Sequence, residues 1–175
     1  MEDNQVIITN DVANIEKLEY QRISVGHFVI LSIVTFGLYE LWWIYKTWQF
    51  FQDKEHTDIK PGLRALFSII FLIPLFNKIK KLADKDANTK NYSSVLLFLG
   101  YFIVSLLSLL PDPYFLIATF SIAFLIIPFK TLNYAVDYSE DVKVIDKNKF
   151  SIRQIILLIL GGFIWVLYLA GEIIK

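Results

Sequence analysis

The stretch that most constrains this chain runs from Phe28 to Phe51, FVILSIVTFGLYELWWIYKTWQFF. It begins with a strongly apolar run and ends in an aromatic cluster, with its first cation at Lys46. Trp and Tyr side chains concentrate where a bilayer core meets water, because their rings are apolar and their N–H or O–H groups need a partner. The stretch therefore predicts a membrane segment whose aromatic end lies near the interface.

The first apolar segment extends from about Val25 to Tyr45, which meets the length of about 20 apolar residues that a spanning helix needs. Two interpretations remain open. The favoured one is a single tilted spanning helix with its aromatic end in the interface. In the other, Gly37 breaks the helix, so that the chain dips in and returns.

The later segments differ in clarity. Within Leu63–Ile79 the uncharged core is about 18 Å of helix, which is short for a span, and Pro74 inside it is expected to kink it. A short second span and an interfacial or re-entrant helix both fit. Two charge-free runs flank Pro111 and Pro113, which cannot continue a helix, and they predict an antiparallel helical hairpin.

The predicted fold is all-α: an integral membrane helical bundle with four spanning helices and a short kinked, interfacial or re-entrant helix, or alternatively five spans. Residues 1–22 are expected to form a polar tail, and residues 23–175 a single membrane domain. Residues 131–150 are expected to form a polar loop with room for a short helix. The predicted segments are about 25–45, 63–79, 93–110, 114–130 and 152–170.

Composition excludes several classes of function. The formal net charge is zero, so no basic field favours nucleic acid. Cysteine is absent, which excludes disulfides and thiolate chemistry. Residues 46–90 and 130–153 hold nine and five Lys or Arg residues, and the positive-inside rule places both regions in the cytoplasm. The turn at Asp112 is then outside, and the side of the N-terminus depends on whether 63–79 crosses.

The stretch from Ile30 to Trp48 resembles small bacterial membrane proteins known as a domain of unknown function, the group numbered 4234. Their pattern is an apolar run followed by T-x-G-[IL]-Y-x-x-[YW]-W-x-[YF]-[KR]. The matching residues here are Thr35, Gly37, Leu38, Tyr39, Trp42, Trp43, Tyr45 and Lys46. A second element of related proteins, P-x-x-R-A-[IL]-F, is similar to Pro61–Phe67. The resemblance implies an integral protein of the bacterial inner membrane and no particular reaction.

Glu40 is the only acid inside an apolar run, and an ionisable residue within a membrane is a functional hypothesis by default. The competing interpretation is a hydrated carboxylate at headgroup depth. We expect Glu40 to pair with Arg64, because a guanidinium is the best nearby partner for a partly dehydrated carboxylate. The remaining candidates are interfacial aromatics, packing glycines and lysines that contact lipid headgroups: Trp42, Trp43, Tyr45 and Trp48; Gly37, Gly161 and Gly162; Lys78, Lys80 and Lys81.

No catalytic constellation, metal site or cofactor motif stands out, and His27 and His56 have no clustered third ligand. The favoured function is a non-enzymatic inner-membrane protein that scaffolds, senses or regulates a partner. An oligomeric pore or membrane-disrupting protein and a small-molecule or ion transporter are the alternatives. The expected partners are the lipid bilayer and either a second copy or a membrane protein, with no nucleic acid.

Overall fold

The computed structural model describes residues 17–84, 92–111 and 114–174. Within these residues the chain is mostly helical, as predicted, with one small sheet. Along the chain the elements are β1 (Leu18–Ile23), α2 (Val25–Val34), α3 (Leu38–Glu55), α4 (Pro61–Leu66), α5 (Ser68–Ala83), α6 (Ser94–Leu106), the 3-10 helices η2 (Leu107–Leu109) and η3 (Tyr114–Ser121), α7 (Ile122–Asp137), β2 (Val142–Lys147) and α8 (Ile152–Ile174).

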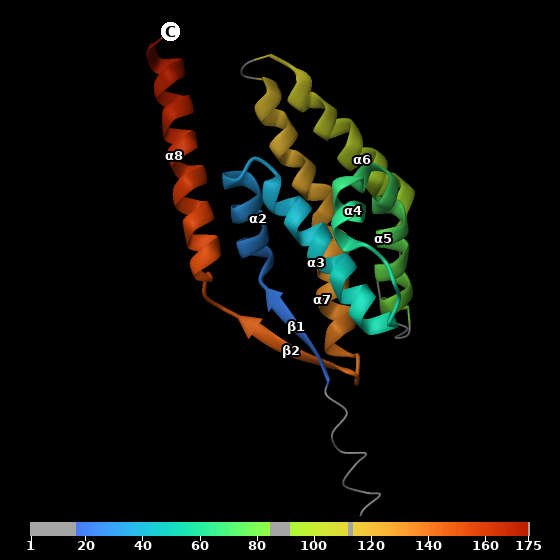
Figure 1. Ribbon diagram of the computed structural model, residues 1–175. Helices are drawn as coiled ribbons and strands as arrows, with labels where there is room; N and C mark the ends of the chain where they lie inside the picture. Colours follow the sequence, from blue (N-terminus) through green and yellow to red (C-terminus); the bar gives the residue numbers. More distant parts are fainter. Residues whose placement is uncertain (1–16, 85–91, 112–113, 175) are drawn as a thin grey trace, which may run out of the picture.

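The molecule has two chemically different ends (Figure 1). The sheet β1–β2 lies at one end, which we call the polar end. The turn between α6 and η3 and the end of α8 lie at the other, the apolar end. The α6–α7 hairpin and α8 extend furthest toward the apolar end, whereas the turn between α2 and α3 stops short of it. The α2–α3 turn therefore lies closer to the polar end than the α6–η3 turn and the end of α8.

The first apolar segment is broken, so the prediction of one continuous helix over 25–45 is wrong. Helix α2 has ten residues and starts at an N-cap, Ser24, whose hydroxyl accepts the His27 N–H. Phe36 and Gly37 both adopt positive φ, 52° and 86°, which no helix can continue through. The chain turns there, and α3 runs back toward the polar end (Figure 1). The alternative interpretation, a break at Gly37, is the observed one.

The second apolar segment is also divided. The break falls at Phe67, between the six-residue helix α4 and the longer α5. Pro61 occupies the first turn of α4, where its missing N–H costs nothing. Pro74, expected to kink the segment, lies inside α5, and the helix continues past it to Ala83.

The helical hairpin predicted around Pro111 is present. Helix α6 continues into η2, and after the turn η3 continues into α7. Helix α7 extends to Asp137, so the start of the predicted 131–150 loop is helical instead. Among the described residues, two helices, Tyr114–Asp137 and Ile152–Gly171, are long and apolar enough to cross a membrane. The four spans of the prediction are not shown.

The sheet departs from the all-α prediction. Strand β1 lies in the predicted polar tail and β2 in the predicted polar loop. The two strands pair in parallel, with Leu18 opposite Val142 and Ile23 opposite Lys147. Parallel strands need a crossover connection, and here the whole helical region between Ser24 and Asp141 supplies it. The sheet thus ties the start of the described chain to the segment that precedes α8.

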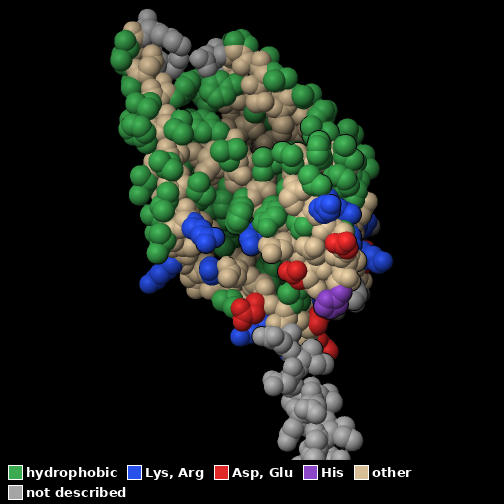
Figure 2. Space-filling view, viewed as in Figure 1, with side chains coloured by type: hydrophobic (Ala, Val, Ile, Leu, Met, Phe, Trp, Pro, Cys, Tyr) green, Lys and Arg blue, Asp and Glu red, His purple; other side chains and the backbone are tan. Residues whose placement is uncertain are grey.

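Aromatic rings form the centre of the core, between α2, α3 and α7. The Phe28 ring stacks on Phe129 with centroids 4.4 Å apart, and Trp43 lies 5.5 Å from Phe28. Trp48, Leu72 and Leu132 are fully buried around them. By contrast, nearly all apolar side chains of α8 are exposed. Figure 2 shows the same contrast on the surface: hydrophobic side chains cover the apolar half, and charged side chains gather over the polar half.

Candidate functional site

The turn between α2 and α3 is held by the hydroxyl of Thr35. This group donates to the Leu31 carbonyl at 2.7 Å and accepts the Tyr39 N–H at 3.0 Å. The hydroxyl is therefore a second donor to the Leu31 carbonyl, which also accepts the Thr35 N–H at 3.0 Å, and it satisfies one free N–H at the start of α3. Gly37 closes the turn by donating its N–H to the Ser32 carbonyl at 2.8 Å. The T-x-G part of the sequence pattern thus encodes a helix break, and Gly37 serves that turn instead of helix packing.

Glu40 lies directly after this turn, in the first turn of α3, and only 2% of it is exposed. A Cβ atom built on Gly37 would be 3.9 Å from the Glu40 carboxyl carbon, so the carboxyl group lies close to the turn. The Tyr101 hydroxyl on α6 hydrogen-bonds to it. A carboxyl group at the start of a helix also interacts favourably with the helix dipole. Glu40 is therefore an enclosed group and not a hydrated carboxylate.

The predicted Glu40–Arg64 pair is not formed. Arg64 on α4 lies over the Trp48 ring, with its guanidinium carbon 4.3 Å from the ring centroid, and 5.3 Å from the Phe71 centroid. Trp48 is eight residues beyond Glu40 on α3, or about 12 Å along the helix. The ion pairs among the described residues do not include Glu40. A cation–π contact thus replaces the expected ion pair.

The four predicted interfacial aromatics divide between two faces of α3. Trp43 and Trp48 are buried in the core, so the prediction of an interfacial position is wrong for both. Trp42 is 45% exposed, and the Lys46 ammonium lies 5.3 Å from its ring centroid. Tyr45 is half-buried and lies 5.8 Å from the same ammonium. The outer face, with Trp42 and Tyr45 beside Lys46, combines solvent-accessible rings with a cation, which is the arrangement typical of an interface.

The two neighbouring glycines of α8 have different surroundings. A Cβ atom on Gly161 would lie 2.3 Å from the Val34 carbonyl oxygen, closer than real contacts allow. On Gly162 it would meet nothing within 4 Å. Next to Gly161, the Trp165 indole N–H donates to the Ile33 carbonyl at 3.3 Å, and its ring stacks on Phe36 at 4.7 Å. Gly161 therefore brings α8 against the end of α2, whereas Gly162 does not take part.

Ion pairs join the elements of the polar end. Arg22 on β1 binds both Asp137 on α7 and Asp146 on β2, the latter at 2.6 Å. The hydrogen bond from Arg22 lowers the pKa of Asp146. Lys54 on α3 reaches Asp141 at 2.6 Å, and Lys143 on β2 reaches Glu19 on β1 at 3.1 Å. We call β1, β2 and these pairs the polar cap.

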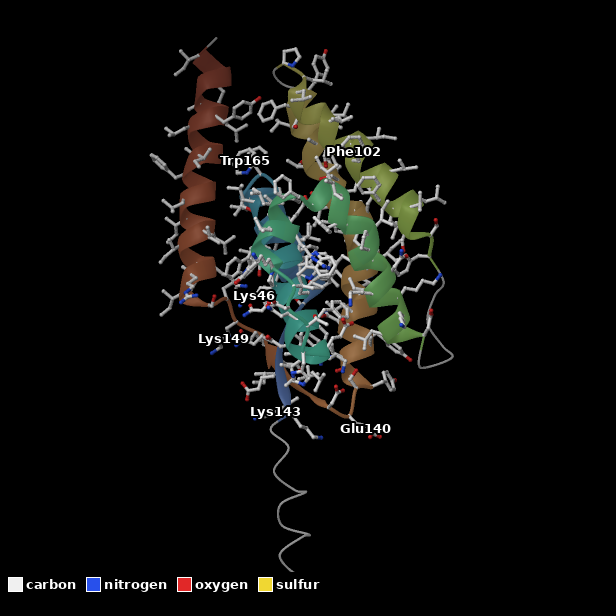
Figure 3. All side chains as sticks on the ribbon, turned by 45° about the vertical axis from the view of Figure 1, so that its right-hand side comes forward. Lys46, Phe102, Glu140, Lys143, Lys149 and Trp165 are labelled. Atoms are coloured by element: carbon white, nitrogen blue, oxygen red, sulfur yellow. The ribbon has the colours of Figure 1, made fainter. Side chains whose placement is uncertain are left out.

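The predicted headgroup lysines lie near the end of α5. Lys78 pairs with Glu55 and lies over the Phe51 ring at 5.5 Å, so its charge is already neutralised by an acid. Lys80 and Lys81 form no ion pair with the described residues. Lys46 and Lys149 also form no ion pair with the described residues, and in Figure 3 both lie at about the level where α8 starts. Phe102 and Trp165 lie further toward the apolar end (Figure 3).

Three contributors were not among the site residues proposed from the sequence: Thr35, Tyr101 and Gly100. A Cβ atom on Gly100 would be 2.1 Å from the Phe124 ring, so this glycine sets the distance between α6 and α7. Thr35 belongs to the recognised pattern, and its polar hydroxyl beside Gly37 was the available signal. Tyr101 lies in an otherwise apolar run, and nothing in its spacing connects it to Glu40.

The described residues contain no group of three or more His, Asp or Glu side chains placed to hold a metal ion. His27 packs edge-on against Phe150 with centroids 4.2 Å apart, and His56 ends α3 with a positive φ. Neither histidine thus converges on a common point with other ligands.

These features define a helical protein with a broken first helix, a polar cap at one end and, among the described residues, two helices long and apolar enough to span a membrane. Comparison with known protein families identifies the family of the chain. The domain of unknown function DUF4234 matches residues 23–173, and the chain belongs to this family, as the Thr35–Lys46 pattern predicted. No curated protein and no solved structure matches the chain.

Proposed function

We propose that the protein is an integral protein of a bacterial inner membrane, with the polar cap in the cytoplasm. In this arrangement the α6–α7 hairpin and α8 cross the bilayer. Helix α8, with 23 residues, is about 35 Å long, enough for a hydrocarbon core of about 30 Å. Its exposed apolar side chains support a lipid environment, since a soluble protein rarely exposes so large an apolar surface.

The α2–α3 and α4–α5 segments enter the membrane and return without crossing it. Helix α2 is about 15 Å long, half of the hydrocarbon thickness. The Thr35 hydroxyl and neighbouring backbone bonds pair the N–H groups of its turn, which suits burial in a membrane protein. The basic regions 46–90 and 130–153 then lie on one side with β1, which agrees with the positive-inside rule.

This topology predicts the accessibility of single cysteines introduced into the cysteine-free chain. Gln21→Cys and Lys81→Cys are expected to resist an impermeant thiol reagent in intact spheroplasts and to react after permeabilisation. Ser108→Cys, at the apolar end, is expected to react in both states. Asp112, the outward position expected from the sequence, lies outside the described residues. Labelling of position 21 without permeabilisation would show that the first segment crosses the membrane once.

For the role, we propose a non-enzymatic scaffold that presents the polar cap to a partner at the cytoplasmic surface. The observation that carries this proposal is the cap itself: ion pairs connect β1 to β2 and α7, and α3 to Asp141 directly before β2, in one polar surface. Exposed pairs each contribute little stability, about 0–1 kcal/mol. A network that contributes so little to stability but fixes the geometry of a surface suits recognition.

A photo-crosslinking amino acid at Glu140 is expected to form a discrete adduct in cells, because Glu140 is exposed on the cap. The same amino acid at Leu109, at the apolar end, is the matched control and is expected to give no discrete protein adduct. Arg22→Gln, which removes both Asp137 and Asp146 pairs, is expected to weaken the Glu140 adduct by at least threefold. Equal adducts from both positions, or an unchanged adduct in the Arg22 variant, would contradict the scaffold role.

The two alternatives have less support. A pore assembled through Gly161 would need a face that α2 already covers. A transporter built on broken helices has the break at Gly37 in its favour, with Glu40 next to it. However, Glu40 is enclosed and bound to Tyr101, which favours a structural role for its carboxyl group.

A further inference from the structure

A shallow apolar groove runs between α3 and α4 on the outside of the molecule. It has a volume of about 330 Å³, at the lower end of the range of about 300–1,000 Å³ found for small-molecule sites. Leu38, Leu41, Trp42 and Tyr45 line it from α3, and Gly62 and Leu66 line it from α4. The lining is almost entirely apolar, which suits a hydrocarbon chain.

A cation adjoins this groove. The ammonium of Lys46 lies 5.3 Å from the Trp42 ring and 5.8 Å from the Tyr45 ring, and both rings line the groove. Its hydrogen-bond partner is the Gln49 side chain at 2.9 Å, and no acid of the described chain neutralises it. Because Lys46 follows Trp42 by one helical turn toward the polar end, the charge is at the end of the groove that faces the membrane surface.

We propose that this groove binds one acidic phospholipid of the surrounding bilayer, with an acyl chain between α3 and α4 and the phosphate at Lys46. Charge complementarity selects this occupant. An apolar groove with a free ammonium at its headgroup end fits a chain that carries an anion, and the indole and phenol rings beside the ammonium suit the interface. The proposal rests on the membrane location proposed above.

Gly62 offers a way to close the groove without disturbing the fold. A Cβ atom on Gly62 would meet nothing within 4 Å, and leucine has a higher helix propensity than glycine. Gly62→Leu is therefore expected to fill the groove while α4 stays folded. Lys46→Gln removes the charge and keeps the groove. Lys149→Gln is the matched control, since Lys149 is an exposed cation near the same level but outside the groove.

The experiment uses tryptophan quenching by brominated phospholipids in bilayers of defined composition. With Trp165 replaced by Phe, the remaining exposed tryptophan is Trp42, because Trp43 and Trp48 are buried. Brominated phosphatidylglycerol is expected to quench at a mole fraction about fivefold lower than brominated phosphatidylcholine, the factor that corresponds to about 1 kcal/mol for one lysine near an anionic leaflet.

Lys46→Gln is expected to remove this preference, Lys149→Gln to keep it, and Gly62→Leu to reduce quenching by both lipids. Equal quenching by the two lipids in the parent protein would overturn the proposal, as would a preference that survives in Lys46→Gln or undiminished quenching in Gly62→Leu. Failure of the membrane location has a different signature: the protein would not float with the vesicles, and neither lipid would quench Trp42.

Discussion

Gly161→Leu is expected to separate α8 from α2 and to lower the free energy of unfolding by about 1–3 kcal/mol, the usual cost of overpacking a close contact. The physical reason is the 2.3 Å distance between a built Cβ atom and the Val34 carbonyl oxygen. This oxygen belongs to the backbone at the end of α2, so it cannot rotate away as a side chain would. The steric overlap can therefore be relieved only if α8 moves away from α2.

Gly162→Leu is the matched control, because a Cβ atom there meets nothing within 4 Å. Both substitutions gain about the same helix propensity, up to about 1 kcal/mol, so the difference between the two variants isolates the contact with Val34. Thermal unfolding in detergent measures the stability. Trp165 fluorescence reports the position of α8, since its indole binds the Ile33 carbonyl. Equal stability of the two variants would mean that α8 does not pack on α2 through Gly161.

The same pair of glycines shows where prediction from sequence ends. The Gly161-Gly162 sequence indicated a close helix contact, and the packing of α8 on α2 uses one of the two. Which one depends on the rotation of α8 about its axis. That rotation is set by contacts such as Trp165 with Phe36, between residues far apart in the chain. No local pattern in the sequence contains this information.

Local signals did predict the α6–α7 hairpin. Charge-free runs of sufficient length and two prolines in the turn act within a few residues of one another, so they can be seen without the fold. The break at Gly37 was only an alternative, because a run of about 20 apolar residues satisfies a spanning helix equally well. The positive φ values of Phe36 and Gly37 and the hydrogen bonds of the Thr35 hydroxyl show that the helix breaks at Gly37.

The pairing of β1 with β2 could not be predicted from the sequence, because the two strands are far apart in the chain. Strands β1 and β2 lie in segments that looked merely polar, and each is stable only because the other is present. The burial of Trp43 and Trp48 is similar: an aromatic cluster indicates an interface, but the packing of α3 against α7 and α4 decides which rings face inward. The sequence predicted the residue types of the candidate site and missed their partners.

The contrast between the partner expected from the sequence and the partner in the structure has its largest consequence at Glu40. The sequence suggested Arg64, whereas the structure has the Tyr101 hydroxyl bound to the Glu40 carboxyl group and Arg64 over Trp48. A hydrogen bond that involves a charged group contributes about 1.5–3 kcal/mol, and a buried group left without its partner incurs a desolvation penalty. Replacing either Glu40 or Tyr101 alone is therefore expected to be destabilising.

Two double-mutant cycles in detergent separate the two partners. Glu40→Met keeps the length of the side chain and removes the acceptor, and Tyr101→Phe removes only the hydroxyl. Their coupling is expected to be about 1–3 kcal/mol, because the double variant leaves neither group stranded and costs less than the sum of the single changes. Glu40→Met with Arg64→Met is expected to couple by less than about 0.5 kcal/mol, as for residues that share no contact.

The second cycle also controls for a general loosening of α3, since Arg64 contacts the same helix through Trp48. Strong coupling to Arg64 and none to Tyr101 would restore the ion pair and contradict the structure at this site. Coupling to Tyr101 alone would assign the Glu40 carboxyl group to fastening the α2–α3 turn against α6. A carboxyl group that fastens this turn has to stay bound to Tyr101, whereas a carboxyl group in a transport site has to bind and release a substrate. Coupling to Tyr101 alone would therefore favour the scaffold over the transporter.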